Sequence, residues 1–168
     1  MKKLVGVLII VFMVSCQQSK IGYVDNVKLL NDYQEKIDLE AKYKSKIEVF
    51  GKKRDSIQQA FDIEARAFQS KAQKMAQKKA QEEYGLLQQK SQFIGQQLQQ
   101  EEQQLQVASR TDMDSIVQKV KREIKDYGKA NGFTYILGGG DGGAVLYGTD
   151  PDNLTEAITK ILNDKYKE

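Results

Sequence analysis

Apolar residues in the middle of the chain recur at steps of three and four for more than a hundred residues, without an interrupting proline. This is the spacing of one face of an α-helix. The repeat is clearest from Ile47 to Met75 and again from Tyr84 to Leu105. At about 1.5 Å per residue, half of such a segment already spans roughly 70–80 Å. The pattern therefore predicts a helical arm at about residues 27–131, which either folds back as an antiparallel, coiled-coil-like hairpin or runs on as a filament.

The segments on both sides of this arm have the pattern of β-strands. Residues 21–25 read Ile-Gly-Tyr-Val-Asp, and residues 133–137 are rich in β-branched and aromatic side chains. A glycine-rich turn follows, and residues 144–147 are a further candidate strand that would form a hairpin with 133–137. The expected fold class is α+β, with a small β head built from residues 21–25 and 133–148.

Two further boundaries follow from local signals. The turn between the two halves of the arm is expected near residues 70–79, where the apolar pattern thins. A last helix is expected at about residues 153–166, where Asn153 and Glu156 have the spacing of a capping box.

The apolar seam of the first half of the arm is irregular. Arg54, Glu64 and Lys71 occupy seam positions that a tight coiled coil fills with apolar residues. We expect a loose seam, most of which packs inside the hairpin while its margins give weak, adaptable contact to a partner. The predicted apolar stripe consists of Phe50, Phe61, Phe68 and Met75.

The first residues have the pattern of a targeting segment. Lys2 and Lys3 precede an apolar run over residues 4–14, which is shorter than the roughly 20 residues of a membrane-spanning helix. The run ends in Met-Val-Ser-Cys, which resembles a bacterial lipobox. We expect a signal peptide over residues 1–15, lipidation of Cys16, and a polar tether over residues 16–20. The alternative is an ordinary secretory signal in which the cysteine is incidental.

Composition excludes several classes of function. Without Lys2 and Lys3 the chain has 24 basic and 23 acidic residues, so net charge gives no support for nucleic-acid binding. Histidine is absent, which removes the commonest general base at neutral pH. Gly138, Gly140 and Gly143 match G-x-G-x-x-G, but a strand pattern rather than a helix follows. We therefore expect no enzymatic activity, no cofactor and no metal site.

Charge is unevenly distributed along the arm. Residues 41–80 contain eleven basic and four acidic residues, whereas residues 81–110 contain two basic and four acidic residues. The expected tip carries lysines without a neighbouring acid. These residues either form a solvated face or attract acidic clients and anionic lipid head groups. The candidate client-binding cations are Arg66, Lys71, Lys74, Lys78 and Lys79.

The chain resembles the Skp (OmpH-like) family of periplasmic chaperones. The resemblance rests on residues 21–25, on Leu-Leu-Asn-Asp-Tyr at residues 29–33 and on the closing block 145–162, and it covers essentially all of residues 21–168. It implies a homotrimer in which three helical arms surround a cavity. It also implies ATP-independent binding of unfolded outer-membrane proteins, which prevents their aggregation. The lipobox and the long glycine turn at residues 138–143 depart from the family pattern.

Two functions are compatible with these features. The first is a periplasmic holdase, anchored by lipid to the inner or outer membrane. The second is a structural envelope lipoprotein whose coiled coil acts as a spacer or tether. The candidate β head favours the first, because a spacer does not need one.

Overall fold

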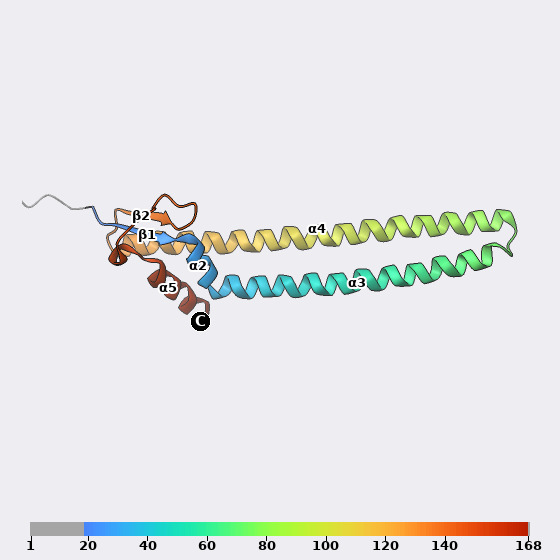
Figure 1. The fold of residues 1–168 in the computed structure, drawn as a ribbon, viewed down its shortest axis with the longest axis horizontal. Coiled ribbons are helices and arrows are strands. Elements are labelled where there is room, and N and C mark those ends of the chain that lie inside the picture. Colours follow the sequence, from blue (N-terminus) through green and yellow to red (C-terminus); the bar gives the residue numbers. More distant parts are fainter. Residues whose placement is uncertain (1–18, 168) are drawn as a thin grey trace, which may run out of the picture. The chain divides into compact units, whose positions relative to one another are not determined.

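The structure is a computed structural model that describes residues 19–167. The described part of the chain is mostly helical and divides into two compact units (Figure 1). We call residues 19–34 and 119–167 the head, and Glu35–Gln118 the arm. The predicted signal peptide, Cys16 and the first part of the tether lie outside the described residues.

The head contains a two-stranded parallel sheet. Strand β1 (Ile21–Asp25) pairs with β2 (Tyr135–Gly139), with Ile21 opposite Tyr135. Successive side chains in a strand point to opposite faces. Accordingly, Gly22 and Val24 are buried on one face, whereas Ile21 and Tyr135 are exposed on the other.

The predicted hairpin between residues 133–137 and 144–147 was wrong. Within residues 144–147 only Val145 makes a bridge, which is parallel and joins it to Gly139. The intervening glycines allow this, because Gly140 and Gly142 adopt positive φ and the chain then folds tightly back onto β2. A β-carbon on Gly143 would lie only 2.6 Å from the Gly139 backbone.

The glycine turn also contacts the start of helix α2 (Asn26–Asp32). Asp25 caps this helix, since its Oδ1 accepts hydrogen bonds from the amides of Val27 at 3.0 Å and Lys28 at 2.9 Å. Gly140 has φ +81°, and a β-carbon there would collide with the Asp25 carboxylate. The turn therefore needs glycine both for its backbone conformation and for its approach to the capping residue.

The helical segment is interrupted at Tyr33, where the prediction had a continuous arm. Tyr33 is extended, with φ −81° and ψ 115°, and separates α2 from α3 (Gln34–Ala72). Asn163 in α5 (Thr155–Lys167) bonds to both sides of the break. It accepts from the Gln34 amide at 2.8 Å and donates to the Asp32 carbonyl at 3.0 Å. One side chain thus satisfies two backbone groups that the interrupted helix leaves open.

The core of the head lies between β1, α2 and α5. Helix α5 begins at Thr155 rather than next to Asn153, after a short 3-10 turn at Asp150–Asp152. Asn153 accepts from the Thr155 amide at 3.1 Å, while Glu156 pairs with Lys28, so the expected capping box does not form. The buried apolar residues of the head are Val24, Leu29, Tyr33, Val120, Leu154, Ile158 and Leu162.

The arm consists of α3 and the first part of α4 (Gln77–Ala130), joined by a turn at residues 73–76. This turn lies within the predicted range of 70–79. Ion pairs cross between the helices, and their partner numbers fall along α4 as they rise along α3. The two helices lie side by side in the arm (Figure 1). The crossing pairs are Lys42–Asp112, Lys53–Glu101 and Glu64–Lys90.

Candidate binding surface of the arm

The predicted apolar stripe lies in the seam between α3 and α4. Phe50 is buried near the base of the arm, whereas Phe61, Phe68 and Met75 are only half-buried. Phe68 stacks on Tyr84 of α4, with ring centroids 6.3 Å apart. Most of the stripe therefore packs within the arm, and its contact with a client stays a prediction.

A buried tyrosine ties the two helices together near Phe50. The Tyr43 hydroxyl donates a hydrogen bond of 2.8 Å to Asp112 Oδ2, and Lys42 reaches the same oxygen at 3.4 Å. The bond from Tyr43 and then Lys42 hold the pKa of Asp112 below its ordinary 3.8. The bond to Asp112 raises the pKa of Tyr43 above its ordinary 10.0. Both shifts favour the neutral tyrosine bound to the ionised aspartate.

A second set of apolar side chains is exposed on the arm and was missed by the sequence analysis. These side chains are between 59% and 69% exposed. All five occupy heptad position c when the seam is counted from Ile47 in α3 and from Tyr84 in α4. The signal was present in the sequence as spacings of seven and fourteen residues. The set comprises Val49 and Ile63 on α3 and Leu86, Phe93 and Val107 on α4.

These five residues belong to one side of the arm. Position c lies beside position g on the helix surface, because residues three and four apart are neighbours. The ion pairs show that α4 returns along α3, and in that arrangement the g positions of both helices meet on the same side. We call this side the c/g face.

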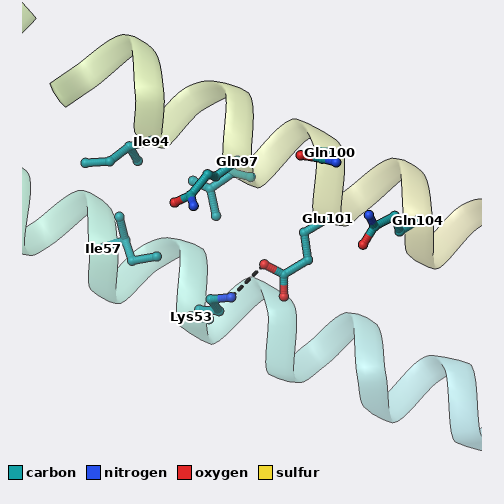
Figure 2. Close-up of a pocket in the computed structure, with 8 residues that line it drawn as sticks. Lys53, Ile57, Ile94, Gln97, Gln100, Glu101 and Gln104 are labelled. Atoms are coloured by element: carbon teal, nitrogen blue, oxygen red, sulfur yellow. Dashed lines mark hydrogen bonds and ion pairs between the residues drawn. The ribbon is translucent and has the colours of Figure 1, made fainter. Parts of the chain in front are cut away.

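Two clefts between α3 and α4 open on the c/g face. The first, of about 410 Å³, is crossed by the 2.6 Å ion pair between Lys53 and Glu101 (Figure 2). The second, of about 330 Å³, contains the Glu64–Lys90 ion pair and the exposed Leu86. The other residues lining the first cleft are Ile57, Ile94, Gln97, Leu98, Gln100 and Gln104.

A third cleft lies nearer the base of the arm. It has a volume of about 570 Å³ and includes Ile47, Phe50 and Leu105. Glu102 and Ser109, which also line it, occupy position e, on the side opposite the c/g face. Clefts therefore flank the seam on both sides.

The turn of the arm brings together the predicted cations. Lys71 is in the last turn of α3, Lys74 is in the connecting turn, and Lys78 and Lys79 begin α4. All four are exposed, and so is Arg66 one turn earlier. Across residues 19–167, none of these five cations forms an ion pair with an acidic side chain.

Lys78 and Lys79 are placed where a helix disfavours cations. The amino-terminal end of a helix carries partial positive charge, and the first turn of α4 contains no acidic residue. These two lysines therefore weaken the helix start rather than strengthen it. The role of these cations in client binding stays a prediction.

Other kinds of site find no support within the described residues. No group of three or more His, Cys, Asp or Glu side chains there is arranged to hold a metal ion. In the same part of the chain, no helix is both long and apolar enough to cross a membrane.

Comparisons with known proteins agree with this architecture. The family described as "Outer membrane protein (OmpH-like)" matches residues 20–162. The crystal structure of a "putative outer membrane chaperone (OmpH-like)" from Caulobacter crescentus superposes with a TM-score of 0.78. That match covers 88% of this chain and 85% of the other, at 16% sequence identity, so it shows a shared fold. No curated protein sequence matches the chain. Since the family match spans most of its length, the chain belongs to the OmpH-like outer membrane protein family.

Proposed function

We propose that this protein is an ATP-independent holdase of the bacterial periplasm, which binds unfolded outer-membrane proteins and prevents their aggregation. The c/g face carries the proposal, because a row of exposed apolar residues lies on it, one of which, Leu86, lines the second cleft. Such exposure on a folded chain marks a binding surface. Membership of the OmpH-like family and the fold shared with a putative outer membrane chaperone support the same role.

The charge distribution supports two separate roles along the arm, one for its turn and one for its c/g face. The unpaired lysines at the turn attract acidic segments over a distance and speed their encounter. The apolar residues of the c/g face then hold the client by weak, non-directional contacts, which tolerate many sequences. Unfolded barrel proteins fit this surface because their strands alternate apolar and polar residues. The seam residues Phe50, Phe61, Phe68 and Met75 would contribute where their edges are exposed.

We further propose that three copies assemble through their heads and that Cys16 carries a lipid anchor. The outer face of the sheet exposes Ile21, Tyr135 and Leu137, and the nearby segment exposes Leu146 and Tyr147. An apolar surface of this kind on a small head fits burial between subunits. The antiparallel arms of three chains would then enclose the client.

The test is suppression of aggregation. A urea-unfolded outer-membrane barrel protein is diluted into the chain from Gln17 to Glu168, and light scattering is followed while the mass of the complex is measured. Suppression with one client per three chains is the expected result. The variant Leu86→Ser/Phe93→Ser/Val107→Ser should lose most of this activity and keep its helical circular dichroism.

The matched control replaces three exposed glutamines at position f of the same helix. Gln89→Ser/Gln96→Ser/Gln103→Ser has the same number of changes and points away from the clefts. It should suppress scattering as the parent does. Unchanged suppression by the apolar variant would contradict the proposed role of the c/g face. No suppression by the folded parent would instead favour the structural spacer, which the 39 and 54 residues of α3 and α4 would also serve.

A further inference from the structure

The first cleft of the c/g face is unusual in its chemistry. Gln97, Gln100 and Gln104 of α4 line it, and Gln97 and Gln104 lie on either side of Glu101 (Figure 2). All three are exposed, and none of their amides has a hydrogen-bond partner within residues 19–167. Each amide offers two N–H donors and one carbonyl acceptor. The cleft is therefore lined with uncommitted hydrogen-bonding groups.

The same cleft is electrically balanced. Its only two charged lining residues, Lys53 and Glu101, neutralise each other at 2.6 Å. A free cation or anion therefore finds no unpaired counter-charge there. Charge complementarity favours a neutral ligand that is rich in both donors and acceptors.

The apolar part of the cleft adds a second requirement. Ile57, Ile94 and Leu98 line it between the helices, and Phe93 and Val107 lie on the c/g face beyond its two ends. Gln97 and Gln104 are seven residues apart, or about 10.5 Å along the helix. An extended polypeptide covers that distance with about three residues. A ligand with apolar side chains and a regular series of amide groups matches both features.

We infer that this cleft binds the main chain of an extended, uncharged segment of unfolded polypeptide. The glutamine amides donate to its carbonyl groups and accept from its N–H groups. Its apolar side chains contact Ile57, Ile94 and Leu98. The inference rests on the proposed function and names the part of the client that is recognised. Main-chain recognition also explains how one cleft can accept many sequences, because every residue except proline presents the same donor and acceptor.

The test compares two peptides. One is a nine-residue peptide of alternating Val and Ser with blocked ends, and the other carries N-methyl groups on alternate residues, which remove N–H donors. Binding to the chain from Gln17 to Glu168 is measured by isothermal titration. The parent should bind the unmethylated peptide roughly tenfold more tightly, as expected for two or three lost hydrogen bonds. Gln97→Ala/Gln100→Ala/Gln104→Ala should abolish that preference.

A direct readout accompanies the affinities. Side-chain amide resonances of Gln97, Gln100 and Gln104 in ¹⁵N-labelled protein should shift on addition of the unmethylated peptide. The control Gln89→Ala/Gln96→Ala/Gln103→Ala should keep the tenfold preference, because these residues occupy position f.

Three results would overturn the inference: equal affinity of the parent for both peptides, no binding of either, or a preference that survives in the Gln97/Gln100/Gln104 variant. Each is separable from failure of the proposed function. The light-scattering assay with a barrel protein reports holdase activity whether or not the glutamines contact the main chain.

Discussion

Single polar side chains stabilise the helix start and the helix break in this small head. Asp25 caps α2, and Asn163 spans the break at Tyr33 with one accepted and one donated hydrogen bond. The ring of Tyr166 packs edge-on against Tyr33 at 6.4 Å. With so few buried residues, each of these contacts is a large share of the stability of the head.

Replacing Asn163 should have a measurable effect on stability. Asn163→Ala removes both hydrogen bonds at the break, and we expect a loss of about 1–2 kcal/mol in the free energy of unfolding. Asn163→Asp keeps an acceptor for the Gln34 amide and should lose less. Urea denaturation followed by circular dichroism measures both. Equal stability of Asn163→Ala and the parent would show that the bridge contributes nothing.

The bond between Tyr43 and Asp112 makes a prediction about pH. The pKa of Asp112 is lowered, so its contribution to stability is present above its ordinary 3.8 and is lost as pH falls through the lower folded value. The pKa of Tyr43 is raised, so its contribution is present below 10.0 and is lost as pH rises through the higher folded value. Stability linked to this pair should be constant between these limits.

Thermal unfolding from pH 3 to pH 11 tests this for the parent and for Tyr43→Phe. The variant keeps the buried ring but loses the hydroxyl, so its Tm should be lower at neutral pH. The gap between the two proteins should narrow at both extremes. A gap that does not change with pH would mean that the hydroxyl acts through something other than Asp112.

At the level of whole helices, the beginning of α4 carries two lysines, Lys78 and Lys79, where the helix dipole disfavours positive charge. Lys78→Glu/Lys79→Glu places acids where the helix favours them, so the arm should melt at the same or a higher temperature. Association with an unfolded client of net negative charge should nevertheless slow several-fold. Stopped-flow fluorescence with a labelled client measures the rate. The control Lys44→Glu/Lys52→Glu makes the same change in net charge away from the turn, and equal slowing by both variants would contradict a special role for the turn.

The helices also show what could be predicted from the sequence. Helical periodicity is a local signal, so the long helices and the turn near Lys74 were predictable from neighbouring residues. The break at Tyr33 could not be predicted in this way. The Gln34 amide beside the break bonds to Asn163, which lies 129 residues away in the chain. The parallel bridge of Val145 was missed for a related reason: glycine turns permit many directions, and packing against Asp25 selects one.

The candidate site was predicted only in part. The tip lysines cluster because they are close in sequence. The position of the aromatic residues in the seam could be predicted from the heptad repeat. The exposed c/g face required both the heptad register and the pairing of α3 with α4, which brings Leu86 and Phe93 to the same side as Ile63. Each helix by itself shows only its own part of that surface.

For the molecule as a whole, as far as residues 19–167 describe it, the most exposed large apolar side chains are in the head. Among the described residues Leu146 is 97% exposed and Tyr147 is 87% exposed, although both follow a well-packed glycine turn. Apolar side chains that are exposed to this extent do not stabilise a single chain. They are consistent with the proposed assembly of heads.

Polar replacements at these two positions should separate assembly from folding. Leu146→Ser/Tyr147→Ser should leave the helical circular dichroism unchanged, because neither side chain is buried within the chain. Its mass in analytical ultracentrifugation should fall toward that of one chain. Lys121→Ser/Lys125→Ser, which changes two exposed residues of α4 in the head that form no ion pair within residues 19–167, serves as the control. A parent that is itself a single chain at high concentration would remove the basis for assembly through this surface.

The parallel pairing of β1 with β2 also sets an order of events during folding. Ile21 pairs with Tyr135, which lies more than a hundred residues later in the chain. The backbone beside the break at Tyr33 bonds to Asn163, which lies later still. The arm depends on contacts that are closer in sequence, such as Glu64 with Lys90. Because contacts between distant residues form slowly, we expect the arm to form first and the head to close only when α5 packs against α2. A folding copy therefore forms the c/g face before the closed head that the proposed assembly requires.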